Sequence, residues 1–239
     1  MGALKFPVSG LGVFTDEATQ RHPLGTGAED RFGRMFRYVE VGGSDLVVGN
    51  LLQHPAQIAN HQDLTPSAAA IGDRLITVTP GATGGEANLY AGGIAVIDTT
   101  PGLGYSYPIS GHAAITALTA FDVNLARGWE IAVALTGSSR VSLYSNPFRN
   151  VIQMPTTATG APVGVCVYII TADQFGWVCT RGPCGVLVAG TPAVGTGVTN
   201  SGSVAGAVAA SGADTTSEVG RMMDTGQDGK VQGVYLTID

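Results

Sequence analysis

The chain has 239 residues, of which 35 are glycine, roughly double the usual share, and only 13% are charged, about half the usual share. Because 44% of the residues are hydrophobic, the low charge does not indicate disorder, and the chain is long enough to bury a core as one large β domain or two small ones. The net charge of −6 comes with scattered basic residues and with no apolar run near the roughly 18 residues of a membrane helix, so we expect neither a nucleic-acid partner nor a membrane.

Residues 1–33 are predicted to form an extended N-terminal arm. Proline and glycine punctuate this stretch, and its apolar side chains follow no period that would let them build their own core. Burying such a side chain contributes roughly 1.5–3 kcal/mol, while ordering the backbone costs about 1–2 kcal/mol per residue. We therefore expect the arm to order against a sister subunit or a partner surface, through five apolar contact residues: Leu4, Phe6, Leu11, Val13 and Phe14.

From Arg34 onwards strand signals dominate, which predicts a β-rich domain over 34–239, with two β subdomains as an alternative and a central hairpin region near 80–160. β-Branched and aromatic residues gather in short runs that end at glycine or proline. These runs predict strands at 34–41, 46–48, 51–52, 75–79, 93–99, 105–109, 129–135, 141–144, 163–170, 176–180, 185–188 and 234–238.

Turn and helix signals complete the pattern. Arg181-Gly182-Pro183 is predicted to be the turn of a hairpin. Short helices are predicted at 65–71, where Thr65 can cap the helix and Pro66 can take its first position, and at 112–120. Many short strands between Gly/Pro turns predict an all-β fold: a Gly-rich β-barrel or β-sandwich with an extended N-terminal arm and little helix.

The three cysteines are Cys166, Cys179 and Cys184. Their odd number and wide spacing argue against a disulfide framework, so we expect three buried or half-buried free thiols. A bridge between Cys179 and Cys184 is the alternative, because the two would flank the predicted turn and face each other across the hairpin.

No catalytic template fits the sequence. The glycine runs at 81–85 and 195–197 lack the Lys-Ser/Thr of a phosphate-binding loop. His54 and His61 are seven residues apart, which is not the spacing of a zinc signature. Asp224-Thr-Gly226 lacks the second copy and the apolar strands of an aspartic protease. We therefore expect no catalytic residue, no cofactor and no metal ion.

Several Gly and aromatic motifs occur together along most of residues 24–239. The clearest are 33–39, 42–43 and 46–52 in the first third, 90–98 and 107–112 in the centre, and 162–165, 175–178 and 182–183 towards the end. In these positions the chain resembles a group of small tailed-phage head proteins that decorate or cement the capsid.

This resemblance implies a non-enzymatic structural protein of the virion, made in the host cytoplasm and placed on the capsid exterior. Its partners would be the major capsid protein, whose lattice it stabilises, and itself as a homotrimer. Two other functions remain open: another virion component, such as a head fibre, tail or baseplate protein, and a carbohydrate-binding β-sandwich module. The last would require Trp129, Trp177 and Tyr144 to be adjacent and exposed to solvent.

Overall fold

A computed structural model describes residues 12–212 and 217–239 of the chain, and the prediction of an all-β fold is confirmed over these residues. Within them the one helical element is a single 3₁₀ turn, Ala59–His61. None of these residues forms a helix long and apolar enough to cross a membrane.

Both predicted short helices are wrong. In the first, Pro66 and Ala69 form isolated β-bridges to Val78 and Leu135. In the second, His112 ends a strand and Ile115 bridges to Gly85. Local capping signals are weak compared with the gain from pairing an apolar segment with a neighbouring strand.

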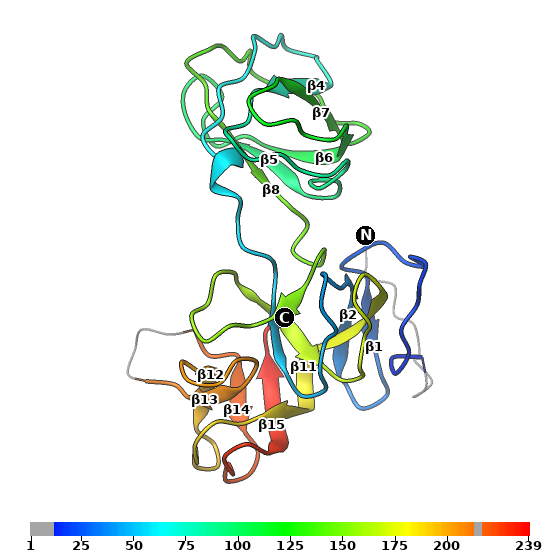
Figure 1. Cartoon of the computed structure of the whole chain (residues 1–239), viewed down its shortest axis with the longest axis vertical. Helices are drawn as coiled ribbons and strands as arrows, with labels where there is room; N and C mark the ends of the chain where they lie inside the picture. Colours follow the sequence, from blue (N-terminus) through cyan, green and yellow to red (C-terminus); the bar gives the residue numbers. More distant parts are fainter. Residues whose placement is uncertain (1–11, 213–216) are drawn as a thin grey trace. The chain divides into compact units, whose positions relative to one another are not determined.

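The chain folds into two compact units (Figure 1). Unit 1 contains the residues up to Ala56 together with Pro147–Asp239, and unit 2 contains Gln57–Asn146. Unit 2 is inserted in unit 1 where the sequence predicts a central hairpin region near 80–160. Its bounds, Gln57 and Asn146, both lie earlier in the chain than the bounds of that predicted region.

Unit 1 is built on a curled antiparallel sheet, which has ten strands in the described part of the chain. The strand order is β13-β12-β14-β15-β11-β10-β3-β9, with β2 also pairing with β11 and β1 pairing with β2. The strands are β1 (Gly27–Glu29), β2 (Met35–Glu40), β3 (Leu51–Gln53), β9 (Ile152–Gln153), β10 (Pro162–Cys166), β11 (Phe175–Leu187), β12 (Gly197–Asn200), β13 (Val208–Ala210), β14 (Gly220–Met222) and β15 (Val231–Thr237).

Strand β11 runs straight through the predicted turn at 181–183, so the prediction of a hairpin there is wrong. Its first half pairs with β2 up to Arg181, and its second half pairs with β15 from Arg181 onwards. A register shift between Cys179 and Arg181, followed by Gly182 at φ +90°, lets the strand change partner. Glycine and proline here mark a bulge inside a long strand.

The described part of the expected arm packs on its own chain. Val13 is buried in the core of unit 1, and Phe14 is half-buried against the same core. Glu17 exchanges two backbone hydrogen bonds with Phe175, each 2.9 Å. Strand β1, inside the expected arm, pairs with β2. The arm therefore does not extend to residue 33 as a separate segment.

Tyr38 shows how this early segment is held. Its hydroxyl group donates a hydrogen bond of 2.7 Å to Glu17, and its ring lies within 5.1 Å of the Trp177 ring, centroid to centroid. Burial raises the pKa of Tyr38 to about 12, so the phenol keeps its proton and remains a donor at neutral pH.

Unit 2 has a smaller antiparallel sheet, with five strands among the described residues, in the order β4-β7-β6-β5-β8. β7 alternates buried and exposed side chains, as expected for a strand with one face on the core. The strands are β4 (Leu75–Val78), β5 (Ile94–Ile97), β6 (Ser106–His112), β7 (Phe121–Leu125) and β8 (Val141–Tyr144).

The predicted strand at 129–135 is wrong, although the residues that motivated it are buried. Ile131 and Leu135 enter the core of unit 2 and donate backbone hydrogen bonds to Asp73 and Ala69. The alternation of apolar residues thus reflects burial. The segment that accepts these hydrogen bonds is irregular, and it forms one isolated β-bridge, Ala69 to Leu135, instead of continuous strand pairing.

We predict that Gly93→Ala destabilises unit 2. A Cβ atom at Gly93 would overlap the carbonyl oxygen of Tyr144, a backbone atom that cannot move without breaking the β5–β8 pairing. The free energy of unfolding of unit 2 should fall by about 3 kcal/mol. Hydrogen exchange of the unit 2 amides measures this, and Gly137→Ala is the control, since a Cβ there meets nothing within 4 Å.

We also predict an acid-sensitive contact in unit 1. Arg37 donates two hydrogen bonds, 2.6 and 2.8 Å, to the carboxylate of Asp239, and these hold the pKa of Asp239 below its ordinary value of 3.8. Asp239→Asn should lower the stability of unit 1 by about 1 kcal/mol at pH 7, as expected for a half-exposed pair.

The pH dependence of that loss follows from the direction of the shift. A depressed carboxylate pKa stabilises the folded state above the unfolded pKa, and the contribution is lost as pH falls through the folded pKa. Urea unfolding at pH 7 and at a pH below 3.8 should therefore show a larger difference between the two proteins at pH 7, and the difference should shrink further as the pH is lowered. An equal difference at both pH values would contradict this account of the pair.

Candidate interaction surface and pocket

Two loops of unit 1 lie side by side and present large apolar residues to solvent. The backbone N–H of Leu46 donates to the carbonyl of Ile170 at 2.9 Å, and that of Gly49 donates to Cys166 at 2.8 Å. The residues between these anchors are apolar, and four of them have high exposed fractions: Val47 54%, Val48 43%, Tyr168 39% and Ile169 55%. The fifth, Val167, is half-buried against the core of unit 1. We call the four exposed residues the apolar tip.

The apolar tip was missed by sequence reasoning. Leu46–Val48 and 163–170 were both predicted as strands, the second as a strand buried on both faces. In the structure β10 ends at Cys166, and the remaining apolar residues continue into the exposed loop. A run of apolar residues that leaves its strand and faces water is typical of an interaction surface.

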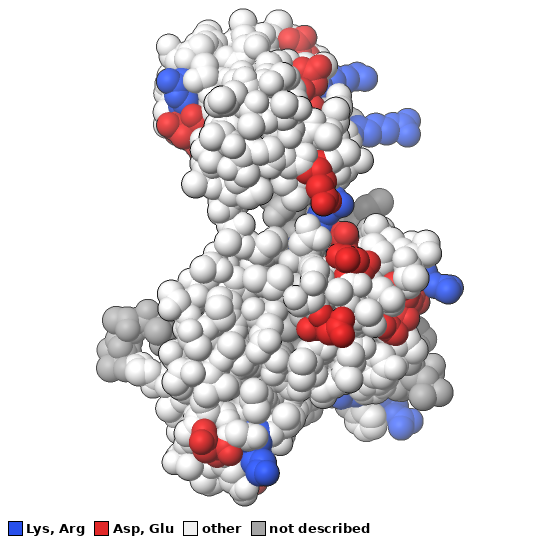
Figure 2. All heavy atoms as spheres, in the orientation of Figure 1, with Lys and Arg blue, Asp and Glu red and all other residues white. Residues whose placement is uncertain are grey.

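Charge is sparse on the surface around these units. On the face shown in Figure 2 most atoms belong to uncharged residues, and lysine and arginine side chains stand apart from one another. Such a surface offers no concentrated positive potential for a phosphate backbone. It is suited to contacts formed by apolar burial and by neutral hydrogen bonds.

The five contact residues predicted from the sequence are not brought together on this surface. Val13 and Phe14 belong to the core of unit 1 and its margin, so they are not free for a partner. Leu4, Phe6 and Leu11 lie outside the described residues.

The aromatic residues required for a carbohydrate platform are not all exposed. Trp177 is 7% exposed and lies in the core of unit 1, whereas Trp129 and Tyr144 are exposed on unit 2. The three side chains therefore do not form the shared platform that this function would need.

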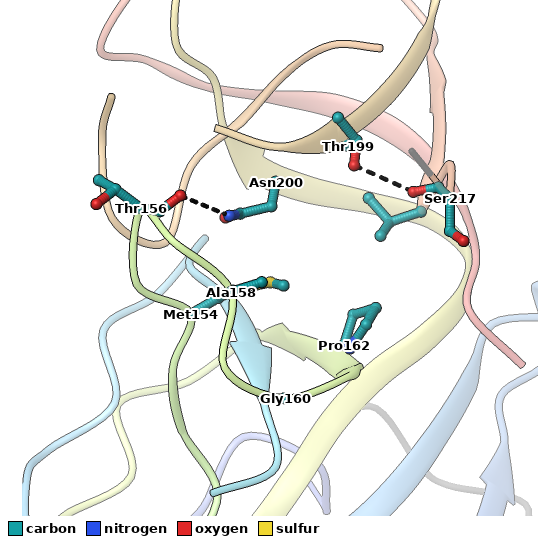
Figure 3. Close-up of a pocket in the computed structure, with 9 residues that line it drawn as sticks. Met154, Thr156, Ala158, Gly160, Pro162, Thr199, Asn200 and Ser217 are labelled. Carbon is teal, nitrogen blue, oxygen red and sulfur yellow. Dashed lines mark hydrogen bonds between the residues drawn. The ribbon is translucent and has the colours of Figure 1, made fainter. Parts of the chain in front are cut away.

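Unit 1 also contains a pocket of about 350 Å³, shown in Figure 3. One wall is an irregular segment, of which every second residue lines the pocket: Met154, Thr156, Ala158, Gly160 and Pro162. The other wall comes from β12 and from the residues that lead into β14: Thr199, Asn200, Ser217 and Val219. None of these nine described residues has an ionisable side chain, so the hydroxyl groups of Thr156, Thr199 and Ser217 have no basic side chain among them to act as an activating base.

Asn200 links the two walls of this pocket. Its Nδ2 donates to the carbonyl oxygens of Pro155 and Thr156, at 3.1 and 3.2 Å. Two acceptors at this nitrogen fix the orientation of the amide, because a flipped side chain would place oxygen against oxygen. The Oδ1 atom is buried and has no donor among the described residues. An acceptor left in this state costs about 1–3 kcal/mol.

Unit 2 buries two histidines on either side of Tyr90. His61 contacts the Tyr90 hydroxyl through Nδ1 (2.5 Å) and the Thr83 carbonyl through Nε2 (2.9 Å). His112 accepts the Tyr90 N–H at Nε2 (3.0 Å) and donates from Nδ1 to the Ala113 carbonyl (2.7 Å). Both rings are engaged in holding the core of the unit. Among the described residues, no group of three His, Cys, Asp or Glu side chains could hold a metal ion.

All three cysteines are buried and free. Burial raises the pKa of Cys166 to about 11. A hydrogen bond between Cys179 and Cys184, together with burial, raises the pKa of Cys184. Since thiolates are the reactive form, a raised pKa makes Cys166 and Cys184 slow to react in the folded protein. The hydrogen bond with Cys184 lowers the pKa of Cys179, so that thiol is protected by its burial alone.

Comparison of the chain with protein-family models, with curated proteins and with solved structures gave no match.

We predict that thiol titration finds three reactive groups in the denatured, unreduced protein and almost none in the native protein within minutes. The reason is that each thiol is buried, out of reach of the reagent. One reactive group after denaturation would instead mean that Cys179 and Cys184 form a bridge.

Proposed function

We propose that this chain is a structural accessory protein of a tailed-phage head, which binds the lattice of the major capsid protein and stabilises it. The proposal starts from the Gly and aromatic motifs that resemble capsid decoration and cement proteins. It includes self-association, as a homotrimer, and a place on the capsid exterior.

The observation that carries the proposal is the apolar tip. Val47, Val48, Tyr168 and Ile169 are four exposed apolar residues on two loops that two backbone hydrogen bonds hold together. A protein that must stay attached to an assembly gains from burying these residues, because apolar contacts need no matched charge and are not weakened by electrostatic screening. The charge-poor surface supports the same proposal. When such a surface packs against another subunit, few charged groups lose their hydration, so the free-energy cost of desolvation is small.

The alternative of a head fibre, tail or baseplate protein shares these surface properties. A tail or baseplate protein differs in the partner, because it would not bind isolated capsids. The capsid-binding test below therefore separates a tail or baseplate protein from a protein of the head.

We predict that the double variant Val48→Asp/Ile169→Asp loses capsid binding. Purified protein is mixed with capsids of the phage that encodes the chain, prepared without this protein, and bound protein is measured by co-sedimentation. Placing two carboxylates in a contact that excludes water should weaken binding at least tenfold, because an unpaired charge is costly to bury. Sedimentation velocity of the same samples reports the oligomeric state.

The matched control is Val194→Asp, since Val194 is an exposed valine of unit 1 outside the apolar tip. It should bind as the unchanged chain does. If the unchanged chain fails to bind capsids, the capsid function is wrong. If the double variant binds with unchanged affinity while remaining folded, the apolar tip is not the contact surface.

A further inference from the structure

The apolar tip has carboxylates at one of its two ends. Its two loops run antiparallel, and the hydrogen bond between Leu46 and Ile170 marks the end where Asp45 precedes one loop and Asp173 follows the other. Both aspartates are exposed. The Oδ1 of Asp45 accepts the N–H of Ala172 at 2.8 Å. The carboxylates therefore belong to the same anchor that holds the two loops together.

No basic side chain offsets the charge at this end. The segments 42–49 and 166–174 contain no lysine, arginine or histidine. A third carboxylate is added by Asp16, whose Oδ2 accepts the hydroxyl proton of Thr171 at 2.8 Å. Within the described part of the chain, no ion pair includes Asp16, Asp45 or Asp173. This end of the tip is therefore net negative.

The opposite end of the tip is apolar. There the N–H of Gly49 donates to the carbonyl of Cys166 at 2.8 Å, and a Cβ atom at Gly49 would lie 2.8 Å from the Cγ2 atom of Val231. Val231 is 51% exposed, so it continues the apolar surface at this end. Lys230 and Asp228 lie just before it in the chain, and their opposite charges offset each other. The tip is therefore acidic at one end and apolar at the other.

We infer that the apolar tip docks into an apolar hollow of a protein partner, and that an arginine or lysine of the partner faces Asp45 and Asp173 at one end of this hollow. Burial of apolar residues supplies affinity but is non-directional. Carboxylates at one end add direction, because they favour a positive partner group and penalise a negative one. The same carboxylates repel a phosphate backbone. The capsid lattice as the partner rests on the proposed function; the charge of the docking surface does not.

The first test removes the two charges and keeps the local structure. Asp45→Asn retains an oxygen that accepts the N–H of Ala172, and asparagine at position 173 tolerates the φ of +60°. Capsid binding of the double variant is measured by co-sedimentation at low and high NaCl concentration. At low salt it should bind about fivefold more weakly than the unchanged chain. At high salt the two should bind alike, since screening removes the contribution of exposed charges.

The matched control is the double variant Asp63→Asn/Asp73→Asn in unit 2. Asp73 accepts a backbone N–H at 2.7 Å, as Asp45 does, and Asp63 has a φ of +53°, close to that of Asp173. The control removes the same net charge, so it should bind as the unchanged chain does at both salt concentrations. Equal weakening by the two double variants would reveal an effect of overall charge and would overturn the inference.

The second test needs no capsid. Three acetylated and amidated tripeptides, Arg-Leu-Arg, Ser-Leu-Ser and Glu-Leu-Glu, are added to the full chain, and the amide signals of Val47 and Ile169 are followed by NMR. The cationic peptide should bind about threefold more tightly than the neutral one, and the anionic peptide should bind most weakly. Asp45→Asn/Asp173→Asn should abolish this preference. Equal affinities for the three peptides, or no shift at millimolar concentration, would contradict the inference.

The two tests separate the inference from the proposed function. If the unchanged chain does not bind capsids, the proposed function is wrong, and the peptides still decide whether the tip selects a cationic apolar ligand. If capsids bind the Asp45→Asn/Asp173→Asn variant as tightly as the unchanged chain at low salt, the inference is wrong and the proposed function stands. Loss of self-association in this variant with capsid binding retained, measured by sedimentation velocity, would assign the tip to a second copy of the chain and would also refute the inference.

Discussion

Unit 1 depends on the double pairing of strand β11. The strand is hydrogen-bonded to β2 along its first half and to β15 along its second, and it also pairs with β10. It thus joins the early strand β2 and the last described strand, β15, in one sheet. Because Trp177 and Cys184 from this strand lie in the same core, a change in its register would disturb the sheet and the core together.

Sequence patterns predicted this architecture where local preference and tertiary pairing agree. The segments 34–41, 75–79 and 141–144 contain dense β-formers bounded by glycine or proline, and each became a strand near its expected bounds. Prediction failed where a local signal can serve two structures. Gly182-Pro183 is compatible with a hairpin turn and with a bulge, and only the positions of β2 and β15 decide between them.

The candidate sites were harder to predict, for a related reason. Exposure of Val47 and Ile169 depends on where β10 ends, which the unbroken apolar run from Val163 does not reveal. The pocket depends on the approach of the segment around Ala158 to Asn200, more than 40 positions later in the chain. No motif encodes such a contact. The burial of Val13 likewise required knowing that the strands after it leave room in the core.

The insertion of unit 2 has a consequence for the order in which the chain folds. Strands β3 and β9 pair directly, Leu52 with Gln153, although unit 2 separates them in sequence. Within unit 2 the ends are already tied, because Gln57 Nε2 donates to the Leu143 carbonyl at 2.6 Å and Leu64 bridges to Val141. Closing a loop of about 100 residues costs about 2 kcal/mol more than closing one of about ten. If unit 2 folds first, it brings the ends of the inserted segment close together. Most of the entropy cost of closing the loop between β3 and β9 is then already met, so the larger sheet is completed faster.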